Sequence, residues 1–224
     1  MIRAVVTDIE GTTSSLSFVH RVLFPYARTR LAEFVAAHRD DPPVRAALDE
    51  ARELLGGKPG DPEVVQAMLQ WIDQDRKLGP LKTIQGMIWE DGYRRGDFTG
   101  HVYEDAVRHL RRWKAQGLDL YIFSSGSVQA QQLLFRHTPY GDLTPLFSGY
   151  FDTRTGPKRE AAAYRAIAAA IGHSAGQTLF LSDVSEELDA AREAGMATVW
   201  LVRGHEPDPL ATHPQAADFD AVEA

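Results

Sequence analysis

Four nearly continuous apolar runs constrain the fold of this chain more than any other feature. They occupy residues 2–8, 118–125, 178–183 and 197–202. Such runs are typical of strands that helices cover on both faces of a parallel sheet. Between them lie patterns of helical periodicity that end in glycine, at 102–117, 158–172 and 185–195. We therefore predict an α/β fold with an open parallel sheet and right-handed crossovers.

The segment from 15 to 100 does not belong to this alternation. It is far longer than the dozen or so residues that a crossover between parallel strands needs. Its apolar residues recur at helical spacing, as in Val44, Ala47, Leu48 and Ala51, or Leu81, Ile84 and Ile88. We predict an α/β core made of residues 1–14 and 101–224, with a small helical domain inserted at 15–100. Two further short strands are expected at 149–153 and 217–222.

Composition excludes several classes of protein. The 224 residues are 44% hydrophobic, enough for one core and a smaller satellite domain. The net charge of −7 disfavours nucleic-acid and anionic-membrane partners. Cysteine is absent, which excludes a disulfide framework and cysteine-ligated metal. The chain enters a strand at once, without a signal peptide, and no apolar run approaches the roughly 20 residues that cross a bilayer. We expect a soluble, cytoplasmic protein.

Polar residues follow three of the four predicted strands directly. Asp8 and Glu10 follow the first strand, Ser124 and Ser125 end the second, and Asp183 ends the third. Ligands of open α/β sheets bind beyond the carboxyl ends of the strands, near the point where the strand order reverses. These side chains are therefore expected at one edge of the sheet.

Each of these features also has an ordinary explanation when it is taken alone. Asp, Ser and Thr are good helix N-caps, so the clusters at Asp8, Ser124 and Asp183 are each compatible with capping. Lys158 stands at a helix N-terminus, where its charge opposes the helix dipole, but taken alone it is better explained as a solvated surface lysine. A calcium loop starting at Asp8 is excluded, because Thr13 and Val19 occupy the positions that require Gly and Glu.

Taken together, the clusters indicate one site. Carboxylates that crowd at neighbouring strand ends repel one another unless a cation lies among them. The available ligands are oxygens, so the cation is expected to be hard, and Mg²⁺ is the natural candidate. A metal ion, serine hydroxyls and a lysine create a positive potential that suits a phosphate dianion.

These residues match a known family. The D-x-[D/E]-G-T motif at Asp8, the strand-end serine, Lys158 and Asp183 resemble the haloacid dehalogenase superfamily, whose fold is Rossmann-like. Within it, the chain is similar to the enolase-phosphatases of methionine salvage. That similarity rests on "DIEGTT", "FSSGSVQAQQLLF", "GPK", "FLSDVSEE" and, in the inserted domain, "DRKLGPLKTIQGMIW".

The resemblance implies a role for each site residue. Asp8 would attack phosphorus and form an aspartyl-phosphate. Ser124 or Ser125, with Lys158, would bind the phosphoryl oxygens. Mg²⁺ would be held by Asp8, Asp183 and the backbone carbonyl of Glu10.

Glu10 departs from most of the superfamily, in which an Asp stands at this position. The resemblance makes Glu10 the general acid/base, with a longer reach than Asp. It implies a small phosphorylated diketone with a methylthio tail as substrate, which is enolised and then dephosphorylated. It also implies a monomer.

The inserted helices are expected to form a lid over the site. Lys82, Gln85 and Trp89 lie on neighbouring turns of one helix, so they are candidates for substrate contact. Core packing for Trp89 and solvent for Lys82 are the alternatives.

Three other functions compete with the enolase-phosphatase. A general small-molecule phosphomonoesterase of the same superfamily has the same core motifs. A haloacid dehalogenase is disfavoured, because its metal-free chemistry has no use for both Glu10 and Asp183. A non-enzymatic phosphometabolite-binding protein is disfavoured by the intact set of Asp8, Lys158 and Asp183.

Overall fold

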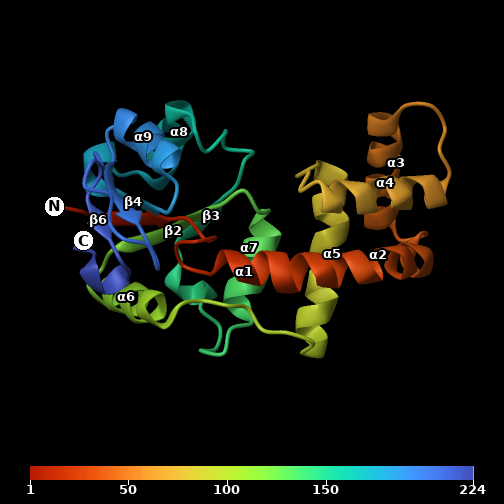
Figure 1. The fold of residues 1–224 in the computed structure, drawn as a ribbon, viewed down its shortest axis with the longest axis horizontal. Coiled ribbons are helices and arrows are strands. Elements are labelled where there is room, and N and C mark those ends of the chain that lie inside the picture. The colour runs from red at the N-terminus through yellow and green to blue at the C-terminus, as the bar shows by residue number, and fades with distance from the viewer. Residues whose placement is uncertain (224) are drawn as a thin grey trace. The chain divides into compact units, whose positions relative to one another are not determined.

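The chain forms two compact units. The structure, a computed structural model, describes residues 1–223. The first unit contains residues 1–16 and the chain from Gly100 onward, and the second is Ser17–Thr99. The second unit corresponds to the insertion expected at 15–100. Figure 1 shows the elements of both units.

The first unit is built on a six-stranded sheet in which every neighbouring pair is parallel, with the order β3-β2-β1-β4-β5-β6. The strands are β1 (Ala4–Thr7), β2 (Asp119–Phe123), β3 (Gly149–Phe151), β4 (Thr178–Ser182), β5 (Ala197–Leu201) and β6 (Gln215–Ala216). This confirms the open parallel α/β sheet. The four long apolar runs are strands, and β3 lies within the short strand expected at 149–153.

The strand expected at 217–222 is wrong. The edge strand is β6, at Gln215–Ala216, and the residues after it form the short 3₁₀ helix η4 (Phe219–Ala221). The Asp218 side chain accepts a hydrogen bond from the backbone N–H of Asp220, at 2.9 Å. Asp commonly starts a turn in this way, and this local bond competes with strand pairing.

Helices cover both faces of the sheet. The helices of this unit are α6 (Glu104–Ala115), α7 (Val128–Arg136), α8 (Ala161–Ile171) and α9 (Ser185–Glu193), with short 3₁₀ helices η2 (Thr144–Leu146) and η3 (Ala175–Gln177). In Figure 1, α8 and α9 lie on one side of the strands and α6 lies on the other. The three helix patterns between the predicted strands are therefore α6, α8 and α9.

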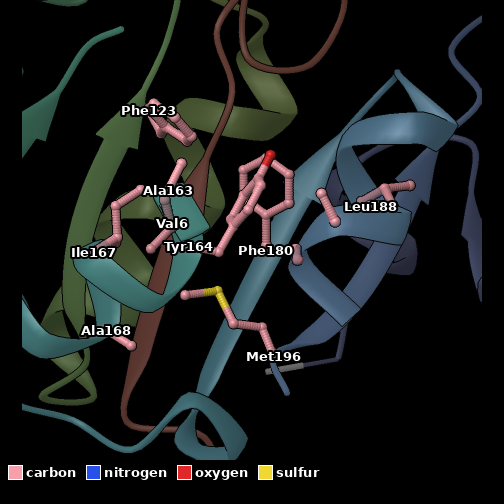
Figure 2. Packing of buried hydrophobic residues seen from close by; sticks show 11 residues of the cluster. Val6, Phe123, Ala163, Tyr164, Ile167, Ala168, Phe180, Leu188 and Met196 are labelled. Carbon is pink, nitrogen blue, oxygen red and sulfur yellow. The ribbon is translucent and has the colours of Figure 1, made fainter. Parts of the chain in front are cut away.

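An aromatic cluster fills the space between the sheet and the α8–α9 layer. Tyr164 of α8 lies between Phe123 of β2 and Phe180 of β4, as Figure 2 shows. Its ring centroid is 5.5 Å from that of Phe123 and 4.9 Å from that of Phe180, both in edge-to-face geometry. Such pairs are more favourable than their buried area alone implies. The Tyr164 hydroxyl donates to the backbone oxygen of Lys158 at 2.7 Å, so the core fixes a site segment directly.

The second unit is helical. Its elements are α1 (Leu16–Phe18, which starts in the first unit), the π-helical turn η1 (Val19–Leu23), α2 (Phe24–His38), α3 (Pro42–Leu55), α4 (Asp61–Asp73) and α5 (Gly79–Arg95). The helix α5 contributes most of its length to the interior of this unit. Trp89 of α5 is buried, and its indole N–H donates to the backbone oxygen of Leu23 at 2.8 Å.

The structure contains no membrane-spanning helix among residues 1–223. None of the helices in this range combines the length and the apolar character that crossing a bilayer requires.

The aromatic cluster predicts the effect of a core truncation. Phe180 is fully buried in β4, so Phe180→Ala should lower the free energy of unfolding by roughly 3–5 kcal/mol through lost burial and the remaining cavity. Urea denaturation followed by circular dichroism measures the change. Leu210→Ala is the control, because Leu210 is 86% exposed. Equal losses in the two variants would contradict the packing described here.

Candidate active site

The strand order places two acidic strand ends side by side. β1 pairs with β2 on one side and with β4 on the other, so the order reverses at β1. Asp8 directly follows β1, and Asp183 directly follows β4. The backbone N–H of Asp8 donates to the oxygen of Leu181 at 2.9 Å, which joins the two strand ends. Ligands bind at such a switch point in open α/β sheets.

Lys158 occupies the centre of this edge. Its ammonium Nζ lies 2.7 Å from Asp8 Oδ1 and 2.7 Å from Glu187 Oε2, and its side chain is 9% exposed. Burial alone would lower the pKa of Lys158, but the charges of Asp8 and Glu187 outweigh burial and raise it above its usual value. The surface-lysine alternative therefore does not apply, because the structure holds Lys158 as a buried cation between two carboxylates.

Glu187 is a residue of this cluster to which sequence analysis assigned no role. It lies on the first turn of α9, one helical turn after Asp183, and accepts a hydrogen bond from the Ser182 hydroxyl at 3.0 Å. Burial and the negative charge of Asp8 raise the pKa of Glu187 to about 7, although Lys158 acts in the opposite direction. The available signal was its place on the first turn of the helix that follows Asp183, because such a turn lies at the carboxyl edge of a parallel sheet.

Asp183 has an oxygen without a protein partner. Its Oδ1 is buried and makes no hydrogen bond with the described residues. Burial raises the pKa of the Asp183 carboxyl group to about 6, and the negative charges of Asp8 and Glu10 add to the shift. An unpaired carboxylate oxygen in a buried position costs free energy unless another group comes to satisfy it.

The loop after β1 packs tightly against this carboxylate. Gly11 has φ = 77°, and a Cβ atom at this position would lie 2.0 Å from Asp183 Oδ2. Within the loop, the Thr13 hydroxyl donates to the backbone oxygen of Asp8 at 3.0 Å, and the Gly11 N–H donates to the oxygen of Ser14 at 2.8 Å. The loop therefore brings Glu10 and Gly11 beside Asp183.

The serines that follow β2 make different contacts. Ser127 is the N-cap of α7, since its hydroxyl accepts from the N–H of Ala130 at 3.3 Å. The buried Ser124 instead accepts from the N–H of Gly126 at 3.2 Å. The capping alternative thus applies to Ser127, while Ser124 and Ser125 lie at the tip of β2, before the cap.

Two further side chains fix the loops that carry these residues. The Gln131 side-chain amide donates to the backbone oxygens of Gly126 and Phe151 at 2.8 and 2.9 Å. Asp152, directly after β3, accepts from the Arg154 side chain at 3.0 Å. These contacts join the serine cluster to the segment that leads to Lys158.

The three remaining candidates, Lys82, Gln85 and Trp89, belong to α5 of the second unit. Gln85 and Trp89 are buried, and Lys82 is partly exposed. The bond from the Trp89 indole to Leu23, and the stacking of Trp89 on Phe24 at 6.4 Å, match the core-packing alternative for this residue.

The residues at the strand ends fit a hard cation. Residues 1–223 contain no group of three or more His, Asp or Glu side chains arranged for a metal ion. Two carboxylates nevertheless lie near each other here. One of them, Asp183, has an unpaired buried oxygen and a pKa raised by burial and by the charge of Asp8. A site of Asp8, Asp183 and a backbone carbonyl, completed by water and phosphate, has the ligand chemistry of Mg²⁺.

Comparisons with known proteins agree with this geometry. The model of a hydrolase family, the haloacid dehalogenase-like hydrolases, matches residues 2–195. The chain is 59% identical to the enolase-phosphatase E1 of Methylococcus capsulatus, over 99% of this chain and 98% of that protein. It is 57% identical to the enolase-phosphatase E1 of Thioalkalivibrio sulfidiphilus, over 99% of both. The crystal structure of the UTR4 protein of Saccharomyces cerevisiae has a TM-score of 0.85 and 34% identity, over 99% of this chain and 100% of that one.

The contact between Gly11 and Asp183 predicts a specific steric effect. Gly11→Ala should be more destabilising than Gly172→Ala by roughly 1–3 kcal/mol, the usual cost of overpacking. Gly172 is the matched control, because its φ is 76° but a Cβ there would meet no atom within 4 Å. Urea unfolding of both variants measures the difference.

A double variant isolates the steric part. Asp183→Ala should remove most of the extra cost of Gly11→Ala, because the two changes act on one contact. Strict additivity of the two substitutions would contradict the close approach of Gly11 to Asp183.

Proposed function

Because the chain belongs to the haloacid dehalogenase-like hydrolases, and within them to the enolase-phosphatases, we propose that it is the enolase-phosphatase of methionine salvage. It converts 2,3-diketo-5-methylthiopentyl-1-phosphate to 1,2-dihydroxy-3-keto-5-methylthiopentene. The observation that carries the chemistry is the buried Lys158 ammonium, 2.7 Å from the Asp8 carboxylate at the switch point.

Asp8 is the nucleophile of the phosphoryl transfer. A carboxylate oxygen of Asp8 attacks phosphorus, the bond from phosphorus to the substrate oxygen breaks, and an aspartyl-phosphate forms. Glu10 gives a proton to the departing oxygen and later takes one from the water that hydrolyses the aspartyl-phosphate. Lys158, with Ser124 and Ser125, binds the phosphoryl oxygens and offsets their charge.

Glu187 acts through Lys158 rather than on the substrate. Its carboxylate binds the same ammonium group as Asp8 and is itself held by the Ser182 hydroxyl. The lysine is therefore held by two carboxylates, one after β1 and one on α9. A lysine held at both sides loses little further freedom when phosphate arrives, which is the advantage of a preorganised site.

We propose that Mg²⁺ binds to Asp8, Asp183 and the backbone carbonyl of Glu10. When bound, the ion offsets the repulsion between these carboxylates and the phosphate and polarises a substrate carbonyl group. The unpaired Oδ1 of Asp183 supports this assignment.

The first half of the reaction is enolisation. A proton leaves the carbon next to a carbonyl group of the diketone, and an enol-phosphate forms before the phosphoryl group is transferred. We propose that the second unit, residues 17–99, acts as the lid that excludes water during both steps. In this proposal Lys82 and Gln85 of α5 contact the substrate, while Trp89 holds the helix from inside. The protein is proposed to act as a monomer in the cytoplasm.

The two half-reactions predict different responses to one substitution. With the diketone phosphate, the wild-type protein should release phosphate and give the ultraviolet absorbance of a conjugated enol. Asp8→Asn should release no phosphate, because an amide cannot form the aspartyl-phosphate, yet should accumulate the enol-phosphate. Phosphate release by the wild type without any enol signal would instead favour a general phosphomonoesterase. Normal turnover by Asp8→Asn would refute the nucleophile.

Metal removal provides a second test. A chelator should abolish phosphate release, and Mg²⁺ should restore it. In Asp183→Asn the half-saturating Mg²⁺ concentration should rise by roughly 10- to 100-fold, because one charged ligand is lost. Glu186→Gln is the control, since this neighbouring carboxylate is 58% exposed, lies 3.8 Å from the surface residue Arg159 and accepts from the Ser185 hydroxyl at 3.4 Å. Calorimetric titration with Mg²⁺ gives an independent readout, and an unchanged affinity in Asp183→Asn would refute the ligand.

A further inference from the structure

Arg203 is a buried cation next to the strand ends but outside the residues described so far. It follows β5 by two residues, and its side chain is 13% exposed. An arginine is rarely enclosed to this extent unless its donors are satisfied. Its position therefore requires an explanation in terms of what the guanidinium group binds.

The guanidinium group makes three kinds of contact. Its two terminal nitrogens bind both carboxylate oxygens of Asp105, at 3.2 and 2.6 Å. Its Nε donates to the backbone oxygen of Thr12 at 2.6 Å. The plane of the group lies over the ring of Tyr103, 3.9 Å from the centroid. A planar fork of this kind is a property of arginine that lysine does not share.

Thr12 belongs to the loop that carries Asp8 and Glu10. The next carbonyl group of this loop, that of Thr13, accepts from the backbone N–H of Tyr103 at 2.9 Å. Arg203 and Tyr103 therefore hold two consecutive carbonyl groups of the loop. Beyond them, the N–H of Ser15 donates to His101 Nδ1 at 3.1 Å.

A small displacement of this loop has consequences at the site. Gly11 precedes Thr12 and has no space for even a Cβ atom beside Asp183. If the bond to Arg203 is lost, the loop keeps its bonds to Tyr103 and His101 but is held less firmly at Thr12, next to Gly11 and Glu10. Displacements of about 1 Å in catalytic groups reduce rates by roughly 100-fold.

We propose that Arg203 is a positioning residue for the nucleophile loop: it fixes Thr12, and through it Glu10 and Asp8, against Asp183. This inference rests on the proposed phosphoryl transfer through Asp8. It assigns Arg203 no contact with the substrate.

A purely structural role is the competing explanation. Asp105 also accepts from the backbone N–H of Phe219 at 2.9 Å, and Arg203 lies 5.4 Å from the Phe219 ring centroid. Arg203 could in that case serve only to attach the C-terminal segment to α6. That role predicts a loss of stability with normal kinetics in the folded protein.

Arg203→Lys separates the two explanations. The lysine keeps a cation for Asp105 but lacks the rigid planar fork, in which Nε and the terminal nitrogens reach the Thr12 oxygen and Asp105 from separate atoms. With a generic aryl phosphate as substrate, kcat should fall by roughly 10- to 100-fold, while KM changes little. With the diketone phosphate, the enol-phosphate should accumulate before phosphate appears, because only the phosphoryl step is slowed.

Asp220→Asn is the matched control. Asp220 attaches the same C-terminal segment to α6 through His109, at 2.9 Å, and through Arg108, and it makes no contact with the loop. This variant should lower Tm but leave kcat within about twofold of the wild type, as for substitutions outside the site. If Arg203→Lys lowers Tm with a normal kcat, the positioning role is overturned.

A second variant keeps the test decisive if Arg203→Lys does not fold. Asp105→Asn weakens the fork that orients Arg203, so kcat should fall by a smaller factor, while an unchanged kcat would overturn the proposal. The aryl phosphate also separates the inference from the proposed substrate. Absence of an enol with the diketone refutes the substrate alone, whereas an Arg203→Lys variant with normal aryl phosphatase kinetics refutes the positioning role alone.

Discussion

A single ammonium group enclosed by two carboxylates is the interaction on which this site depends. Without Lys158, Asp8 and Glu187 would place two negative charges at a buried edge that already contains Asp183. Burial, and after it the negative charge of Asp8, raises the pKa values of both Asp183 and Glu187. One lysine cannot neutralise three acids, so an excess of negative charge remains. That excess is what a divalent cation would offset, so the lysine and the proposed Mg²⁺ are complementary parts of one charge arrangement.

The parallel sheet places these charged residues together without unusual backbone conformations in the strands. Because all six strands run in parallel, their carboxyl ends meet at one edge, and the reversal at β1 opens space beside β4. Each acidic residue only has to follow its strand directly. The aromatic core below the edge then fixes the remaining component, since the Tyr164 hydroxyl holds the backbone of Lys158. Packing and charge placement are thus coupled through one side chain.

Sequence patterns identified the parts of this architecture that have a local signature. Long apolar runs mark buried strands, and residues directly after them mark the site edge, so the sheet and the positions of Asp8 and Asp183 were predictable. The short edge strand was not, because two residues carry no periodicity, and the turn-forming Asp218 was overlooked. The contact of Arg203 with Thr12 joins residues 191 positions apart, and no local sequence pattern predicts it.

The two connections of the inserted unit lie within hydrogen-bond distance of each other inside the first unit, as the bond between Ser15 and His101 shows. Residues of the α/β core just before and just after the insertion are therefore in direct contact. Residues 17–99 therefore form an inserted segment whose two ends leave the first unit close to each other. The entropy lost on closing such a loop grows only slowly with the length of the loop. We therefore expect a core of this kind to tolerate insertions of different lengths at this point while the strand pairing remains unchanged.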